Sequence, residues 1–274
     1  MQASTITVRK LNPAIGAEVT GVDLSRPLGN QQFEEIHDAL MRHLVLVFRD
    51  QTLSVQQHID FGSRFGAPIV HPAAASSVDG HPQIRVVKSD ETTTEATGEV
   101  WHSDLSCQPE PPMGSLLYMI EAPPDGGGDT AFANMYLAYE KLSPRMKAHI
   151  EGLTAIHGSA HVYTQPSYDA RTNRELPRSE HPIVRTHPVT GRKALFVNRG
   201  FTTRIVGLPA AESASILGYL LDYLETPEFQ CRVRWESKSL TFWDNRCAQH
   251  RAIFDYHPNR RYAHRVTIKG DKPF

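Results

Sequence analysis

Helical and strand-like spacings of apolar residues alternate along the whole chain. A helix with Asn30 as its cap is predicted over residues 30–43, and a second helix begins at Ser54 and ends near Gly66. The strongest helical pattern covers residues 210–224, where leucines recur on one face. These helices collect early and in the middle of the chain.

Short strands are predicted throughout, from apolar runs and from two-residue alternation. They cover residues 6–11, 16–24, 44–48, 83–87, 114–120, 131–133, 193–198, 231–235, 239–243 and 262–268. Residues 135–153 indicate two short helices broken near Pro144, and residues 164–185 are predicted to be irregular. Without an internal repeat or a linker, this order indicates one domain over residues 1–274, mainly β with flanking helices.

Residues 71–100 form a polar region around one predicted strand, directly before the first chemical motif. Such a segment can close over a substrate and exclude water, which would make it a lid. The alternative is a solvated surface loop.

Composition excludes several classes of protein. The 274 residues carry a formal net charge of -1 and no basic amphipathic segment, so neither nucleic acid nor a membrane surface is an expected partner. The three cysteines form no CxxC pair, which argues against disulfides and structural zinc and indicates a cytoplasmic, reducing setting. The first residues lack a secretion signal, and no apolar run is long enough to span a bilayer.

Two metal-capable side chains, His102 and Asp104, lie two residues apart. On an extended strand they would point to the same side and offer a nitrogen and an oxygen to one point. His250 could complete a face of two histidines and one carboxylate, which holds Fe(II) and leaves positions open for other ligands. A lone H-x-D is weak, because each histidine alone is more often an ordinary core or surface residue.

Two further residues add to this pattern. The planar guanidinium of Arg261 could hold a remote carboxylate of a bound dicarboxylate, and the Thr130 hydroxyl could donate to the same group. Separately, Arg261 would be a solvated turn cation and Thr130 a strand-start hydroxyl. Their occurrence together, in this order with the metal-capable residues, makes the signal specific.

With these motifs the sequence resembles the taurine dioxygenase / 2,4-dichlorophenoxyacetate dioxygenase (TauD/TfdA) family of Fe(II)- and 2-oxoglutarate-dependent oxygenases. The resemblance covers essentially the whole chain, including Trp101-His102-Ser103-Asp104, Gly127-Gly128-Asp129-Thr130, Trp243-Asp244-Asn245-Arg246, Gln249-His250 and the segment from His264 to Phe274.

The resemblance implies a double-stranded β-helix (jelly-roll, cupin-like) core. It implies Fe(II) on His102, Asp104 and His250, with 2-oxoglutarate and O₂ as co-substrates. Thr130 and Arg261 would hold the distal carboxylate of 2-oxoglutarate, whose decarboxylation to succinate and CO₂ yields the oxidant. The family also implies a homo-oligomer, a dimer or tetramer.

Within the taurine branch, a second anion site matches His71 and Arg265, and an apolar wall matches Phe201 and Tyr163. This chain has Ala74 and Gly98 where the taurine enzyme has a Tyr and an Asn. Their loss would remove polar partners for an ammonium group, so taurine itself is disfavoured. The expected substrate is a small sulfonate or sulfate ester, linked to sulfur metabolism and cleaved to an aldehyde and sulfite or sulfate.

Three alternatives stay open. A phenoxyalkanoate or another small carboxylate could occupy the anion site in the same chemistry. A zinc hydrolase could use the same three ligands, although it would not need Thr130 and Arg261. A catalytically dead binding protein would tolerate loss of a ligand, and here all three are present.

Overall fold

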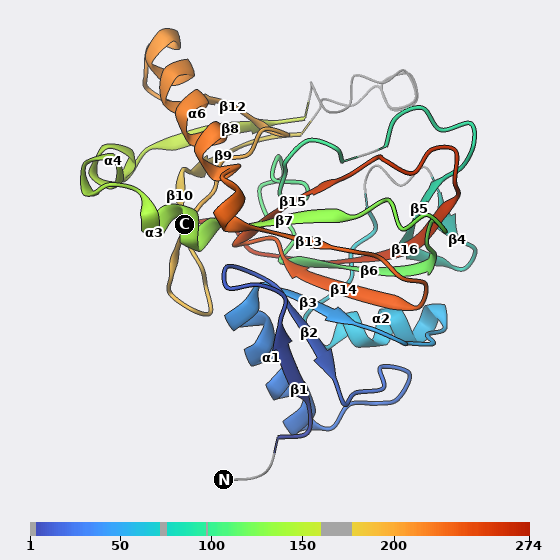
Figure 1. The fold of residues 1–274 in the computed structure, drawn as a ribbon. Helices are drawn as coiled ribbons and strands as arrows, with labels where there is room; N and C mark the ends of the chain where they lie inside the picture. The colour runs from blue at the N-terminus through green and yellow to red at the C-terminus, as the bar shows by residue number, and fades with distance from the viewer. Residues whose placement is uncertain (1–3, 72–75, 97, 160–176) are drawn as a thin grey trace.

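The computed structural model describes residues 4–71, 76–96, 98–159 and 177–274, which form a mixed α/β fold with several antiparallel sheets (Figure 1). The largest sheet has eight strands, and all of its neighbours pair antiparallel except β2 and β3. In spatial order it contains β1 (Thr7–Lys10), β2 (Ala17–Thr20), β3 (Val45–Phe48), β14 (Ser239–Asp244), β6 (Gly114–Glu121), β16 (Arg261–Ile268), β5 (His81–Ser89) and β4 (Ser77–Val78).

Three smaller sheets complete the described β structure. They consist of β13 (Gln230–Val233), β7 (Thr130–Asn134) and β15 (Ala248–Ala252); of β12 (Thr202–Ile205), β8 (Thr154–Gly158) and β9 (Arg178–Pro182); and of β10 (Val184–Thr186) with β11 (Lys193–Leu195). In Figure 1 the β13-β7-β15 sheet lies on one side of the large sheet. The helices α1 (Asn30–His43) and α2 (Val55–Ser63) lie on the other side.

The remaining helices lie at one end of the molecule, beside the smaller sheets (Figure 1). They are α3 (Met135–Lys141), α4 (Pro144–Ile150), α6 (Ala210–Leu224) and the short 3₁₀ helix η1 (Pro227–Phe229).

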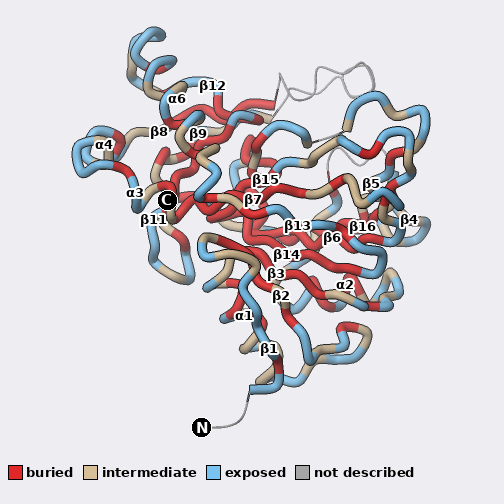
Figure 2. The backbone as a smooth tube through the Cα atoms, in the orientation of Figure 1, coloured by how far each residue is buried: buried red, intermediate tan, exposed pale blue. Residues whose placement is uncertain are grey.

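Strand β3 shows why the large sheet has an apolar run at its centre. Val45 and Val47 point into the core between the sheets, whereas Leu46 and Phe48 point into the core beneath α1 and α2. A strand covered on both faces needs apolar residues at every position, not at every second one. Strand β3 is accordingly buried along its whole length (Figure 2).

Most predicted elements are confirmed, but the ends of the helices show where prediction was right and wrong. Ser54 caps α2 through a reciprocal capping box with Gln57, as expected. The predicted cap at Asn30 is wrong, because Gly29 precedes the helix and no side chain bonds its first turn. Helix α2 stops at Ser63, before Gly66.

The prediction of an irregular section over residues 164–185 is wrong at its end, where β9 and the start of β10 lie; residues 160–176 lie outside the described part. Arg178–Pro182 is polar in sequence and gains its strand geometry from pairing with β8. None of the helices in the described ranges has the length and apolar character to cross a bilayer. All three cysteines are buried as free thiols.

Buried histidines make the fold sensitive to acid. His58 in α2 and His157 in β8 are fully buried, and this burial lowers the pKa of each from 6.5 to about 3. Between pH 6.5 and pH 3 each group is therefore neutral in the native state and protonated in the unfolded state. Stability is unaffected above this range and falls as the pH drops through it, by up to about 1.4 kcal/mol per pH unit for each histidine.

We expect His58→Gln to lessen the loss of unfolding free energy between pH 7 and pH 5 by about 2 kcal/mol, since one titrating group is removed. Urea unfolding of the metal-free protein at both pH values measures this difference. The control is His149→Gln at an exposed position, which should keep the wild-type pH dependence. An unchanged pH dependence in the His58 variant would contradict the assignment.

Candidate functional site

Side chains from two distant parts of the sequence converge between the large sheet and the β13-β7-β15 sheet. The donor atoms of His102, Asp104 and His250 all lie within 4.8 Å of one another. Each imidazole Nε2 is 3.8 Å from Asp104 Oδ1, and the two rings have centroids 4.2 Å apart. Backbone hydrogen bonds of 3.0 and 2.9 Å join His102 and His250 directly.

The expected extended strand at His102–Asp104 is wrong. His102 forms a single β-bridge with His250, and Asp104 opens a turn in which Leu105 has a φ of 47°. Asn245 holds this turn: its carbonyl oxygen accepts from Ser103 Oγ at 2.7 Å, and its Nδ2 donates to Asp104 Oδ2 at 3.3 Å. The turn still brings the two donor atoms to the same point.

Both histidines are set up as neutral ligands. His102 Nδ1 lies 2.7 Å from the carbonyl oxygen of Val100, which can only accept, so Nδ1 carries the proton and Nε2 offers a lone pair. Burial lowers the pKa of His102, and it lowers the pKa of His250 well below the usual value. Both imidazoles are therefore in the neutral form, with one N–H each, near neutral pH.

Asp104 is kept ionised in spite of its burial. Desolvation is the largest single effect and opposes its charge, but Arg265 and the other neighbours of the carboxylate together outweigh it and hold the pKa of Asp104 well below its usual range. Arg265 Nη1 lies 3.1 Å from Oδ1, and Ser115 Oγ donates to Oδ2 at 2.8 Å. One carboxylate and two neutral imidazoles are what a divalent cation requires.

The separations fit such an ion. At 3.8 Å the two N–O pairs are too long for hydrogen bonds. Atoms bound at about 2.1 Å to one metal, at angles of about 90 to 109°, lie about 3.0 to 3.4 Å apart, so small movements of these side chains would let them share an ion.

A second buried cluster, His187, Asp244 and Cys247, also has metal-capable atoms close together. There, however, Asp244 accepts from His187 and from Arg246 at 3.0 and 2.7 Å. His187 Nδ1 accepts from two backbone N–H groups. The imidazole and carboxylate already satisfy each other, so this cluster stabilises the fold.

Thr130 and Arg261 both contact Trp235. Trp235 Nε1 donates to Thr130 Oγ1 at 3.0 Å, which leaves the threonine O–H as a donor. The Arg261 guanidinium carbon lies 5.6 Å from the Trp235 ring centroid. Arg261 is 7% exposed, which excludes the solvated-turn interpretation, and its Nε has no hydrogen-bond partner among the described residues.

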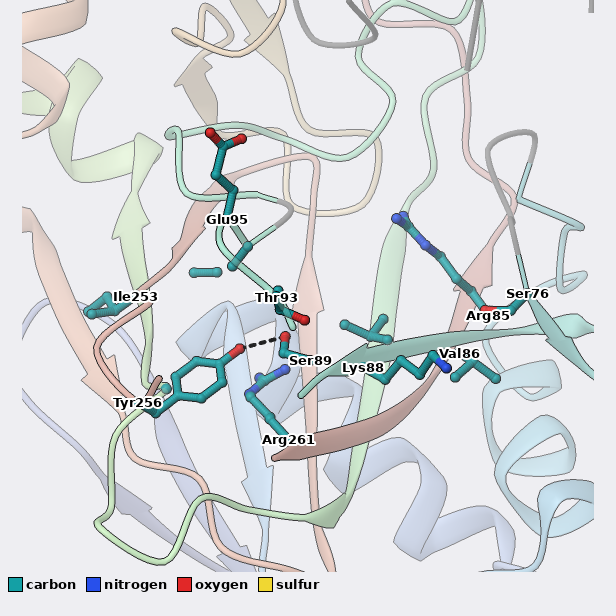
Figure 3. Close-up of a pocket in the computed structure, with 14 residues that line it drawn as sticks. Ser76, Arg85, Val86, Lys88, Ser89, Thr93, Glu95, Ile253, Tyr256 and Arg261 are labelled. Carbon is teal, nitrogen blue, oxygen red and sulfur yellow. Dashed lines mark hydrogen bonds between the residues drawn. The ribbon is translucent and has the colours of Figure 1, made fainter. Parts of the chain in front are cut away.

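Arg261 also lines a cavity of about 210 Å³ (Figure 3). Its lining includes Ser89 and Tyr256, whose hydroxyls lie 2.8 Å apart, and Ala252, two residues after His250. Gly128 closes this end: its φ is +81°, and a Cβ there would lie 3.2 Å from Arg261 and 3.0 Å from Tyr256. The glycine run before Thr130 therefore makes room for the arginine.

The predicted anion site is partly described. His71 and Arg265 are both buried near Asp104, and Phe201 is buried with its ring centroid 6.4 Å from that of His102. Tyr163 and Ala74 lie outside the described residues. Gly98 lies against the metal centre, because a Cβ on it would approach His102 Cε1 to 3.2 Å.

Sequence reasoning missed Arg85, which lines the cavity of Figure 3. It stands directly opposite Arg265 in the β5–β16 register, and its Nη1 lies 3.2 Å from His71 Nε2. Two-residue alternation from a predicted strand could have placed it inside, but pairing with Arg265 needs the register.

The two neutral imidazoles and one carboxylate could hold a metal ion, and a cavity lined by the buried Arg261 starts two residues beyond His250, at Ala252. Residues 7–267 match the family described as "Taurine catabolism dioxygenase TauD, TfdA family". The chain belongs to this family and is an alpha-ketoglutarate-dependent dioxygenase.

Its relatives carry different substrate names at comparable similarity. It is 34% identical to an alpha-ketoglutarate-dependent sulfate ester dioxygenase of Pseudomonas putida, over 99% of this chain and 92% of the relative. It is 32% identical to an alpha-ketoglutarate-dependent 2,4-dichlorophenoxyacetate dioxygenase of Cupriavidus pinatubonensis, over 97% and 99%. The crystal structure of a taurine dioxygenase from Burkholderia xenovorans matches with a TM-score of 0.86 and 36% identity, over 98% of this chain and 92% of that chain.

Close packing behind His102 gives a test of the metal centre. A Cβ at Gly200 would lie 2.8 Å from His102 Cβ, so Gly200→Ala must displace the histidine. We expect affinity for Mn(II), measured by calorimetry, to fall about tenfold or more, as for loss of a residue that orients a ligand.

Gly218→Ala in α6 is the matched control, because nothing lies within 4 Å of the added carbon. That variant should bind Mn(II) as the wild type does and should be equally or slightly more stable. Wild-type affinity in Gly200→Ala would show that His102 does not depend on this contact.

Proposed function

We propose that the protein binds Fe(II) on His102, Asp104 and His250, binds 2-oxoglutarate beside it, and hydroxylates the carbon next to the sulfonate or sulfate group of a small organosulfur substrate. The products would be an aldehyde and sulfite or sulfate, with succinate and CO₂. One observation carries the proposal: a single face of β16 presents two buried arginines, one at the carboxylate of the metal centre and one at the cavity.

The spacing on β16 supports two separate anion positions. Arg261, Ala263 and Arg265 alternate onto the same face, and the two arginines lie about 13 Å apart along the strand. Ala263, which lies between them, has only a methyl side chain. A dicarboxylate can therefore reach from the metal to Arg261 while a second anion lies at Arg265.

Each group on the chain then has a distinct task. Arg261 and Thr130 donate to the distal carboxylate of 2-oxoglutarate, and Trp235 fixes the threonine hydroxyl. Arg265 and His71 bind the substrate's anionic group near the metal. Phe201, with Tyr163 as predicted from the resemblance, limits access of water. When bound, Fe(II) and 2-oxoglutarate together supply the oxidation.

The substrate proposal favours an alkyl sulfate ester or alkyl sulfonate over taurine. Gly98 offers no side chain to an ammonium group. The sulfate ester relative supports this class. The 2,4-dichlorophenoxyacetate relative keeps a phenoxyalkanoate as the second candidate. Membership of the oxygenase family removes the zinc hydrolase and the catalytically dead binding protein from consideration.

Further proposals concern the whole molecule. The large sheet and the β13-β7-β15 sheet enclose one core, which supports a double-stranded β-helix. We also propose one domain over residues 1–274, a homo-oligomeric assembly and a cytoplasmic location, as the sequence predicts.

Anaerobic titration with Fe(II) and 2-oxoglutarate tests the chelate, which should give a visible charge-transfer band. Oxygen is then added with hexyl sulfate, hexanesulfonate, taurine or phenoxyacetate, and succinate, sulfite and sulfate are measured. Substrate-dependent succinate with sulfate or sulfite supports the proposal. Highest activity with taurine would overturn the interpretation of Gly98, and absence of the band would overturn the chelate.

The 2-oxoglutarate pocket can be tested separately. We expect Arg261→Met to weaken 2-oxoglutarate binding, followed through the charge-transfer band, by about 10- to 100-fold, because a charged hydrogen bond to the carboxylate is lost. Thr130→Val should weaken it by less, through loss of a neutral donor. Fe(II) binding should be unchanged in both.

The matched control is Arg260→Met, which removes the adjacent, exposed arginine. It should bind 2-oxoglutarate as the wild type does. Equal weakening in the Arg260 and Arg261 variants would show that net charge, and not a specific contact, attracts the co-substrate.

A further inference from the structure

Two arginines face each other next to the metal centre. Arg85 on β5 and Arg265 on β16 are directly opposed in the antiparallel register. Like charges in this position destabilise a sheet unless an anion lies between or beside them. Asp104 is the carboxylate that Arg265 contacts, and a divalent cation on the same carboxylate would compete for its charge.

The strand faces place Arg85 inside. Ser89 contacts Tyr256 within the cavity, Val87 packs against the core between the sheets, and Arg85 follows on the same face at the next alternate position. In Figure 3 Arg85 and Arg261 lie apart among the residues that line the cavity. The contact of Arg85 with His71, and its position opposite Arg265, which bonds Asp104, put Arg85 near the metal centre and away from the site proposed for the co-substrate's distal carboxylate.

The contact with His71 decides which groups can carry charge here. A guanidinium can only donate, so His71 Nε2 must accept from Arg85 Nη1 across their 3.2 Å contact. His71 is then neutral and can donate only through Nδ1. Arg265 Nη2 and Nε, in contrast, are buried donors with no hydrogen-bond partner among the described residues. The positive charge of this subsite lies on the two arginines.

We propose that Arg85 is a specificity-determining residue, the second guanidinium of the substrate's anion subsite, and that it selects a three-oxygen sulfuric or sulfonic head group over a carboxylate. The inference rests on the proposed function and deepens it. Two planar forks can engage three terminal oxygens, whereas one fork already satisfies the two oxygens of a carboxylate. Arg265 alone would bind either head group.

The test compares binding of hexyl sulfate and hexanoate to the anaerobic Fe(II)·2-oxoglutarate complex by calorimetry. The wild type should bind hexyl sulfate more tightly. Arg85→Met should weaken hexyl sulfate binding by about 10- to 100-fold and hexanoate binding by about threefold or less, since one charged contact is lost only for the larger head group. Arg85→Lys, which keeps the charge without the fork, should give an intermediate loss.

Two readouts separate this role from a structural one. The charge-transfer band and the affinity for 2-oxoglutarate should stay at wild-type values in both variants. Arg9→Met removes an exposed arginine from β1 of the same sheet. This control should leave the affinities for hexyl sulfate and hexanoate unchanged. If Arg85→Met does not fold, the ratio of hexyl sulfate to hexanoate affinity in Arg85→Lys decides.

Equal weakening of both ligands, or none, would overturn the role of Arg85, as would a wild type that binds hexanoate as tightly as hexyl sulfate. Each of these results leaves the chelate intact. Failure of the wild type to form the chelate instead overturns the proposed function.

Discussion

The contact between Arg265 and Asp104 is the interaction on which the rest of the site depends. A buried carboxylate without compensation would cost several kcal/mol, and here three neighbouring strands of the large sheet supply the compensation. Arg265 comes from β16, Ser115 from β6, and Asn245 directly follows β14. Because these strands are adjacent in the order β14-β6-β16, the sheet register itself fixes the position of the carboxylate.

The β13-β7-β15 sheet supplies the third residue of the metal centre. His250 lies on β15, and a pair of backbone hydrogen bonds joins it to His102. The metal centre is therefore a junction between two sheets, and its geometry depends on how closely they pack. Gly200 borders His102 at a distance that admits no side chain without displacement, because a Cβ there would lie 2.8 Å from His102 Cβ. A glycine at this position is thus part of the junction.

The sequence predicted the elements better than the contacts between them. Strand β3 and helix α1 were predictable because their apolar patterns match the faces that they bury. Strand β15 was not predicted, because Ala248–Ala252 contains a glutamine, a histidine and an arginine in place of apolar alternation. The turn at Asp104 and the pairing of Arg85 with Arg265 depend on register, which a pattern along one chain does not contain.

Arg261 and Arg85 differ in how closely the surrounding residues enclose them, and so in how readily each position tolerates substitution. Arg261 is enclosed by Gly128, Tyr256 and Trp235, and we propose that it binds 2-oxoglutarate there. Arg85 is only partly buried and lines the same cavity without being among the residues that enclose Arg261, so a change at Arg85 leaves that enclosure in place. Relatives named for sulfate esters, taurine and 2,4-dichlorophenoxyacetate match this chain at 34%, 36% and 32% identity. With overall similarity so even, we infer that substrate choice depends on such local positions, and the opposed arginines are the local feature that we propose for binding a sulfur oxyanion.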